Sequence, residues 1–141
     1  MKSLLLVAHG SRRQASNDEV RALIGRLRAA AGSFDHLDCA FLELAEPSIA
    51  DGLRQAIAKG ASEVVVLPYF LSAGRHVVTD IPAEIEPVRT AYPSIDIHLA
   101  PYLGAAEGLV GLLMEQAARM INNPPAQGVA RPESSSPGNA G

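Results

Sequence analysis

The sequence predicts a single-domain α/β fold, in which a four-stranded, mostly parallel sheet carries helices on both faces. The first observation is that apolar runs alternate with segments of helical periodicity over residues 1–121. The second is that the apolar runs are continuous, as in strands that are covered on both faces. The third is the length of 141 residues, which suits one hydrophobic core. We expect the strand order 2-1-3-4, in which the first and third strands are neighbours.

Four short apolar runs are the expected strands. They cover residues 3–8, with the sequence SLLLVA, and residues 37–42, 63–70 and 95–99. Each run is too short for a membrane span and has the length of an ordinary strand.

The first two helices have clear start and stop signals. Ser16 is expected to cap the first helix, and Gly32 to end it. Pro47 and Ser48 open the second helix, and Gly60 ends it.

The last two helices are expected over residues 80–92 and 105–121. Pro82 fits the first turn of the third helix, where a missing N–H costs little. Pro87 lies deeper, so we expect it to kink or split that helix. Residues 122–141 are rich in Pro, Ser, Gly and Asn, which predicts a disordered tail after a domain of residues 1–121.

The composition excludes several classes of protein. The formal net charge is -3 and aromatic residues make up 4% of the chain, so neither a basic surface for nucleic acid nor a base-stacking surface is expected. Cys39 is the single cysteine, which rules out an internal disulfide and a thiolate zinc site. The apolar run near the N-terminus is too short for a signal peptide, and no run is long enough to cross a membrane. We therefore expect a cytoplasmic protein with no membrane partner.

Chemically active side chains follow the first three strands, where each strand ends. In an open parallel sheet these ends form one edge, and ligands bind there. With the order 2-1-3-4, His9 and His76 lie in adjacent loops and are expected to share one ligand. The remaining polar residues of these loops are Ser11, Arg12, Arg13, Glu43, Glu46, Gly74 and Arg75.

Each of these residues also has a structural interpretation. His9 can donate to the backbone of its turn, and Glu43 can be a surface acid at a strand end. Glu46 fits the first turn of the next helix, where a negative charge suits the helix dipole. His36 is expected in an exposed loop at the opposite edge, and His98 is expected to pack within the last strand or face a partner.

Other chemistries lack their motifs. The chain has no G-x-x-x-x-G-K-[ST] phosphate loop, no G-x-G-x-x-G after a strand and no G-x-S-x-G nucleophile elbow. The His-Gly-Ser turn is compatible with a hydrolase, but no paired nucleophile is visible. Ala8 also occupies the place before His-Gly where a histidine phosphatase carries arginine.

Three motifs on successive elements resemble the short CbiX/SirB-type sirohydrochlorin chelatases over about residues 1–120. The first is VAHGSR at residues 7–12, and the second is FLExAxPSI at residues 41–49. The third combines LPxFL at residues 67–71 with GxHxxxDIP at residues 74–82.

The resemblance implies an ATP-independent enzyme that inserts Co²⁺, Fe²⁺ or Ni²⁺ into sirohydrochlorin. By motif match, His9 and His76 carry over as the residues that bind the metal and accept protons, and Glu43 as the nearby acid. Longer relatives hold two such domains in one chain, so the resemblance implies a homodimer that forms the same cleft by symmetry. No nucleotide cofactor is expected.

The residue types fit this reaction. Two imidazoles and a carboxylate suit Co²⁺, Fe²⁺ or Ni²⁺ while leaving coordination positions open, and we favour Co²⁺. Arg12 and Arg75 are expected to receive the substrate's carboxylates, with Ser11 and Gly74 as further contacts in the same loops. An alternative is a non-catalytic protein of the same fold that binds a metal or a tetrapyrrole.

Overall fold

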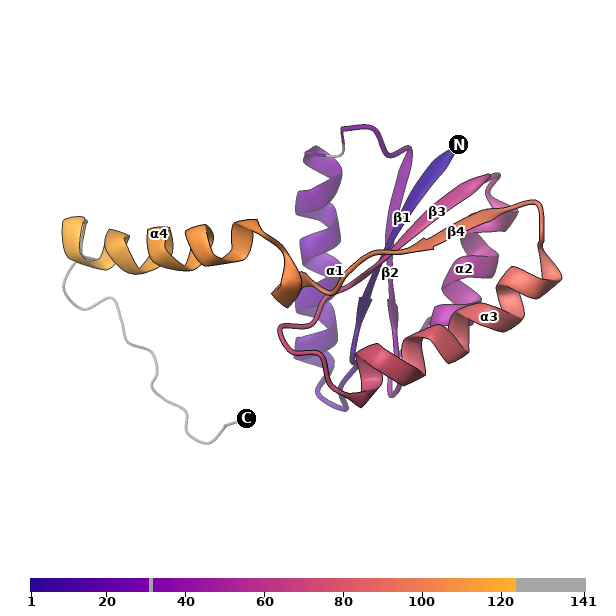
Figure 1. The fold of residues 1–141 in the computed structure, drawn as a ribbon, viewed down its shortest axis with the longest axis horizontal. Coiled ribbons are helices and arrows are strands. Elements are labelled where there is room, and N and C mark those ends of the chain that lie inside the picture. The colour runs from indigo at the N-terminus through magenta and orange to yellow at the C-terminus, as the bar shows by residue number, and fades with distance from the viewer. Residues whose placement is uncertain (31, 124–141) are drawn as a thin grey trace. The chain divides into compact units, whose positions relative to one another are not determined.

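The computed structural model describes residues 1–30 and 32–123. Its sheet has four parallel strands, β1 (Lys2–Ala8), β2 (His36–Phe41), β3 (Glu63–Pro68) and β4 (Asp96–Leu99). Their order is β2-β1-β3-β4, which confirms the predicted order 2-1-3-4 (Figure 1). The register pairs Val7 with Ala40 on one side and with Pro68 on the other, so the ends of β1, β2 and β3 are level. The loops that follow these three strands therefore start from one edge.

Helices cover both faces of the sheet, as predicted. Helix α1 (Gln14–Ala29) lies on one face, and α2 (Ile49–Ala58) and α3 (Ile81–Ala91) lie on the other (Figure 1). A π-helical turn, η1 (His76–Asp80), leads into α3, and a 3₁₀ turn, η2 (Leu103–Ala105), follows β4. Side chains alternate between the two faces along each strand. In β1, Leu5 and Val7 join the core under α2 and α3, while Leu6 packs under α1.

Two predictions about helix ends and breaks were wrong. Helix α1 begins at Gln14 after Arg13, so Ser16 lies inside the first turn and does not cap it. The helix thus starts three residues earlier than a Ser16 cap would place it, and Arg13, the residue before it, makes no side-chain capping bond. Helix α3 also runs through Pro87 without a break, so the predicted split was wrong, while the predicted kink stays a prediction. The loss of one backbone bond is outweighed by burial of Ile85 and Val88.

Other expected boundaries are confirmed. Ser48 caps α2, because its side-chain oxygen accepts a hydrogen bond of 3.1 Å from the backbone N–H of Asp51. Gly60 follows α2 with a φ of 107°, a left-handed conformation that favours glycine.

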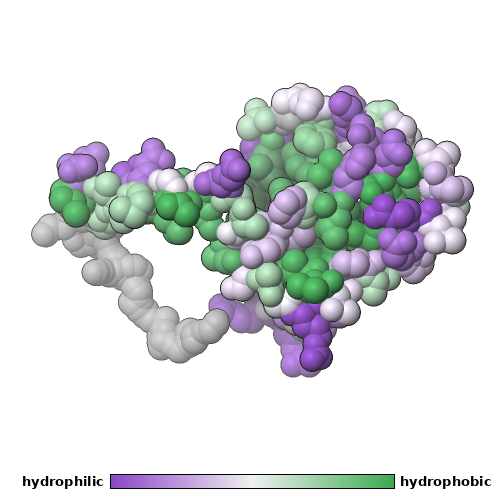
Figure 2. Space-filling view, in the orientation of Figure 1, coloured by the Kyte–Doolittle hydropathy of each residue, from purple (hydrophilic) through white to green (hydrophobic). Residues whose placement is uncertain are grey.

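The chain separates into two compact units, of which the first is Met1–Ala106 and the second begins at Glu107. The described part of the second unit contains α4 (Gly108–Asn122). Hydrophobic residues occupy one side of α4 and hydrophilic residues the other (Figure 2). The prediction of one domain over residues 1–121 stays a prediction, and most of the predicted tail lies outside the described residues. Among the residues that are described, no helix combines the length and apolar character needed to span a bilayer.

Candidate functional site

An imidazole and a carboxylate meet where β1 and β2 end. His9 directly follows β1, and Glu43 lies two residues after β2. His9 Nε2 lies 2.9 Å from Glu43 Oε2, and the two side chains are 46% and 52% exposed. Both groups are thus in contact with each other and open to a ligand.

Backbone hydrogen bonds hold the two loops together. The N–H of Leu42 donates to the carbonyl of Ala8 at 2.9 Å, and the N–H of Glu43 donates to the carbonyl of His9 at 3.0 Å. These bonds continue the parallel pairing of β1 and β2 past the ends of the strands. They bring the backbones of His9 and Glu43 side by side.

Gly10 permits this close approach. Its φ is 95°, and a Cβ at this position would lie 1.8 Å from the carbonyl oxygen of Glu43. No side chain fits there, and a left-handed backbone disfavours any residue but glycine. The His-Gly pair in the sequence therefore has a physical reason: the glycine lets the second loop pass against the first.

The turn around Glu43 carries a second unusual backbone conformation. Leu44 has a φ of 64°, although it is not a glycine, and its side chain is 54% exposed. Such conformations cost about 1–3 kcal/mol and collect at functional sites. The strained residue directly follows the acid that contacts His9.

The third loop places an aromatic ring beside His9. The ring centroids of His9 and Phe70 are 6.4 Å apart with an interplanar angle of 31°. Phe70 packs against the core under α2 and α3. The N–H of the preceding Tyr69 donates to the carbonyl of Val7 at 2.7 Å. The imidazole thus has an apolar neighbour from the loop after β3 and an acidic neighbour from the loop after β2.

His76 is the first residue of η1, in the segment between β3 and α3. The carbonyl of Gly74 accepts hydrogen bonds of 3.1 Å from the N–H groups of Val77 and Val78, which starts this helical segment. The side chain of His76 lies outside what the structure describes. Its distance from His9 therefore stays a prediction.

The predicted substrate-contacting residues lie around this edge. Ser11 is half-buried, and its Oγ accepts a hydrogen bond of 3.0 Å from the N–H of Arg13. Arg12, Gly74 and Arg75 are exposed, as is Arg13. None of the three arginines forms an ion pair with another described residue. Their guanidinium groups are available to an anionic ligand.

Only one of the two acids after β2 contacts the histidine. Glu43 makes that contact, whereas the backbone carbonyl of Glu46 accepts a hydrogen bond of 3.1 Å from Arg21. Within the described part of the chain, no group of three or more His, Cys, Asp or Glu side chains is placed to hold a metal ion.

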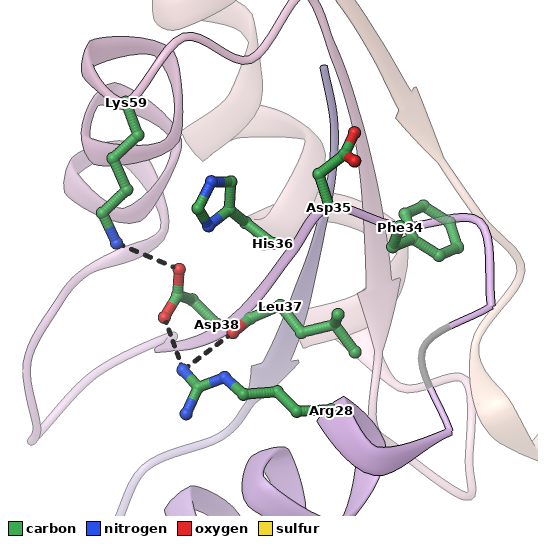
Figure 3. Close-up of a pocket in the computed structure, with 7 residues that line it drawn as sticks. All are labelled: Arg28, Phe34, Asp35, His36, Leu37, Asp38 and Lys59. Atoms are coloured by element: carbon green, nitrogen blue, oxygen red, sulfur yellow. Dashed lines mark hydrogen bonds and ion pairs between the residues drawn. The ribbon is translucent and has the colours of Figure 1, made fainter.

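The remaining histidines lie elsewhere. His98 is exposed, and its Nε2 lies 3.0 Å from Glu63 Oε2. It therefore does not pack within the chain, and the alternative that it faces a partner stays a prediction. His36 is the first residue of β2 and lines a pocket of about 310 Å³ at the opposite end of that strand from Glu43. In this pocket Arg28 and Lys59 both reach the carboxylate of Asp38 (Figure 3). The single carboxylate of Asp38 is thus shared by two cations.

Sequence reasoning missed two residues that support the site. Asn17 hydrogen-bonds the backbone of Ser11, and Arg21 hydrogen-bonds that of Glu46. The signal for Asn17 was present in the sequence, because it lies three residues before Val20 and so begins the apolar stripe of α1 with a polar side chain. Arg21 carries no such signal, because its partner is a backbone carbonyl 25 residues away.

Comparison with known proteins identifies the family of the chain. Residues 3–120 match the family model described as CbiX. The chain is 34% identical over 116 residues to a sirohydrochlorin ferrochelatase of Priestia megaterium, a match that covers 82% of this chain and 43% of the relative. It is 27% identical over 123 residues to a sirohydrochlorin cobaltochelatase of Sulfurisphaera tokodaii, covering 87% of this chain and 97% of the relative.

A solved structure shares the fold. The sirohydrochlorin chelatase SirB from Bacillus subtilis subspecies spizizenii, in complex with cobalt, matches with a TM-score of 0.73 and 31% identity. This match covers 84% of the present chain and 50% of SirB. The chain thus spans half or less of the length of SirB and of the ferrochelatase. The match to the family model over residues 3–120 shows that the chain belongs to the CbiX family.

Proposed function

We propose that this chain is a sirohydrochlorin chelatase that inserts a divalent metal ion into the tetrapyrrole without a nucleotide. The observation that carries the proposal is the contact between His9 and Glu43 at the carboxyl edge of the sheet, in a chain of the CbiX family. Co²⁺ is the favoured metal, and Fe²⁺ and Ni²⁺ are the alternatives. The names of the two relatives specify iron and cobalt, respectively.

The proposed metal ligands are His9, His76 and Glu43. Imidazole nitrogen and carboxylate oxygen suit first-row divalent ions, and a set of two or three such ligands leaves positions open for the pyrrole nitrogens of the substrate. An incomplete coordination sphere is what transfer requires, because a closed site retains its metal. The half-exposed side chains of His9 and Glu43 are consistent with a site that receives and then releases the ion.

The proton shared by His9 and Glu43 limits what the imidazole of His9 can do. At 2.9 Å one proton must lie between His9 Nε2 and Glu43 Oε2, because an unprotonated ring nitrogen and a carboxylate are both acceptors. A metal ion at Nε2 displaces this proton, so Nε2 cannot hold a metal and accept a substrate proton at once. Insertion releases two pyrrole protons. We therefore propose that both imidazoles hold the ion before insertion, and that His9 and His76 divide the roles of ligand and base during insertion. Where His9 is the base, Glu43 stabilises its protonated imidazole.

The surroundings suit a planar, polycarboxylate substrate. Arg12 and Arg75 are proposed to bind its carboxylates, with Ser11 and Gly74 as further contacts. Three exposed apolar side chains belong to the same loops and to η1, and we call them the apolar rim. They are Leu44, Leu71 and Val78, which are 54%, 69% and 65% exposed. Exposed apolar groups beside a polar centre are typical of a ligand site, and here they would cover the face of the macrocycle.

We further propose that two copies of the chain form a homodimer. The chain covers 43% and 50% of two longer relatives, so a second copy would supply what their remaining length supplies. Sedimentation equilibrium checks this proposal, and a monomer at micromolar concentration that turns over at full rate would contradict it.

Turnover with sirohydrochlorin and Co²⁺ tests the proposed function. The change in absorbance of the macrocycle measures insertion. The expected result is many insertions per chain, at a rate above the spontaneous one. A non-catalytic binding protein would convert or retain at most one equivalent. Parallel assays with Co²⁺, Fe²⁺ and Ni²⁺ at equal free concentration then establish which metal is preferred.

A further inference from the structure

Two side chains of α1 hold the loops that carry His9 and Glu43. Asn17 and Arg21 lie four residues apart, so they project from the same side of the helix. Asn17 reaches the loop after β1, and Arg21 reaches the loop after β2. One rigid element thus contacts both loops of the candidate site.

Asn17 is a buried amide with both of its polar groups in use. Asn17 as a whole is only 3% exposed. Oδ1 accepts a hydrogen bond of 3.0 Å from the N–H of Ser11, and Nδ2 donates one of 2.8 Å to the carbonyl of Ser11. Burying an amide costs about 1–3 kcal/mol unless its hydrogen bonds are made, so a leucine would suit this position of the apolar stripe better for packing alone. The two hydrogen bonds to the backbone of Ser11, two residues after His9, explain why a polar residue occupies this position.

Arg21 makes three contacts with its surroundings. Nη2 donates a hydrogen bond of 3.1 Å to the carbonyl of Glu46, and Nη1 lies 3.0 Å from Oδ1 of Asp18. Its Cζ lies 5.1 Å from the centroid of the Phe41 ring, and Phe41 is the last residue of β2. The guanidinium therefore fixes the far end of the loop that begins at Phe41 and carries Glu43.

We propose that Asn17 and Arg21 are positioning residues that set the His9–Glu43 contact. The backbone bonds from Leu42 and Glu43 join the near ends of the two loops, while Asn17 and Arg21 fasten their far ends to α1. The side chains of His9 and Glu43 are about half exposed, so burial alone does not fix their relative position. Their geometry depends on the backbone that presents them.

The consequence for activity rests on the proposed function. Misplacement of a reacting group by about 1 Å lowers the rate by a factor of about 100. Loss of the hydrogen bonds made by Asn17, or of the one that Arg21 makes to Glu46, is therefore expected to lower kcat about 10-fold or more. KM is expected to change less than about 3-fold, because neither side chain is proposed to touch the substrate.

Asn17→Leu and Arg21→Met test the proposal, with Arg26→Met as the matched control on the same helix. Leucine continues the apolar stripe and methionine keeps an unbranched stem, so the melting temperature should stay within a few degrees of the parent or rise. Arg26 is exposed, and its variant is expected to leave every readout unchanged. Parent-like kcat in both Asn17→Leu and Arg21→Met would overturn the proposal.

A second readout does not depend on turnover. In the parent, Glu43→Gln should shift the ring-proton NMR signals of His9, because the two side chains are in contact. In the Asn17→Leu and Arg21→Met backgrounds the same substitution should shift these signals much less, and an undiminished shift would contradict the positioning role. This readout stands even if the parent protein inserts no metal, so failure of the proposed function is distinguished from failure of this inference. If Asn17→Leu does not fold, Arg21→Met decides both readouts alone.

Discussion

Nε2 of His9 and Oε2 of Glu43 lie 2.9 Å apart, although 34 positions of sequence separate the two residues. The contact follows from the order of the strands, because β1 and β2 are parallel neighbours whose ends are level. It also follows from the absence of a side chain at Gly10, where the second loop passes.

Gly10→Ala is expected to lower the free energy of unfolding by more than about 2 kcal/mol, because the new methyl group collides with the carbonyl of Glu43 and the φ of 95° is unfavourable for alanine. Urea denaturation measures the change. Gly25→Ala is the matched control: nothing lies within 4 Å of the added methyl group, and the position is helical. It should leave stability unchanged or raise it by up to about 1 kcal/mol. Equal effects at the two glycines would contradict this account of the turn.

Glu43→Gln and Glu46→Gln separate the two acids of the second loop. Glu43→Gln removes the charge beside His9, so we expect turnover to fall about 10-fold to 100-fold. Glu46→Gln should change turnover less than about 2-fold, since that residue holds Arg21 through its backbone carbonyl, which the substitution retains. Initial rates of metal insertion at saturating substrate measure both. The reverse order of effects would move the assisting acid to Glu46.

Leu71→Ser tests the apolar rim. The side chain is 69% exposed, so its replacement should leave the melting temperature within about 2 °C of the parent. If the rim covers the macrocycle, the apolar area buried on binding decreases and KM for the tetrapyrrole should rise about 3-fold to 10-fold. Steady-state kinetics over a range of substrate concentrations resolve the change. An unaltered KM would remove Leu71 from the substrate surface.

Cys39 is expected to react slowly with iodoacetamide. Burial raises the pKa of its thiol above the ordinary value, and the nearby Arg21 offsets only part of this effect. A raised pKa means that less thiolate is present at any pH below it, and the thiolate is the nucleophile. Mass spectrometry should show slower alkylation at pH 8 in the folded protein than in protein unfolded by guanidinium. Equal rates in the two states would contradict the burial of this thiol.

The sequence predicted the main features of the fold because they depend on local patterns. Continuous apolar runs indicated strands covered on both faces, and Ser48 and Gly60 marked the ends of α2. The side of the sheet at which His9 and Glu43 meet also followed from the parallel order. Ser16 and Pro87 misled because a capping residue and a proline are only local preferences, which the neighbouring loop and the buried face of α3 outweighed.

The supporting residues could not be derived in the same way. The partner of Arg21 is a backbone carbonyl, which has no side-chain signature, and the two residues are 25 positions apart. Asn17 begins the apolar stripe of α1 with a polar side chain, yet that pattern alone does not say which loop its amide holds. Distances between side chains in different loops depend on the packing of α1 against the sheet, which apolar periodicity does not specify.

The coordination of Co²⁺ bound to the full chain tests the central claim most directly. A crystal structure of the cobalt-loaded protein, with the ion located by anomalous scattering, is expected to place it about 2.1 Å from an imidazole nitrogen of His9 and from one of His76. The oxygen of Glu43 should lie within reach of the same ion, in one subunit or across a dimer. An ion bound away from His9, or imidazoles of His9 and His76 too far apart to share it, would contradict the proposed site.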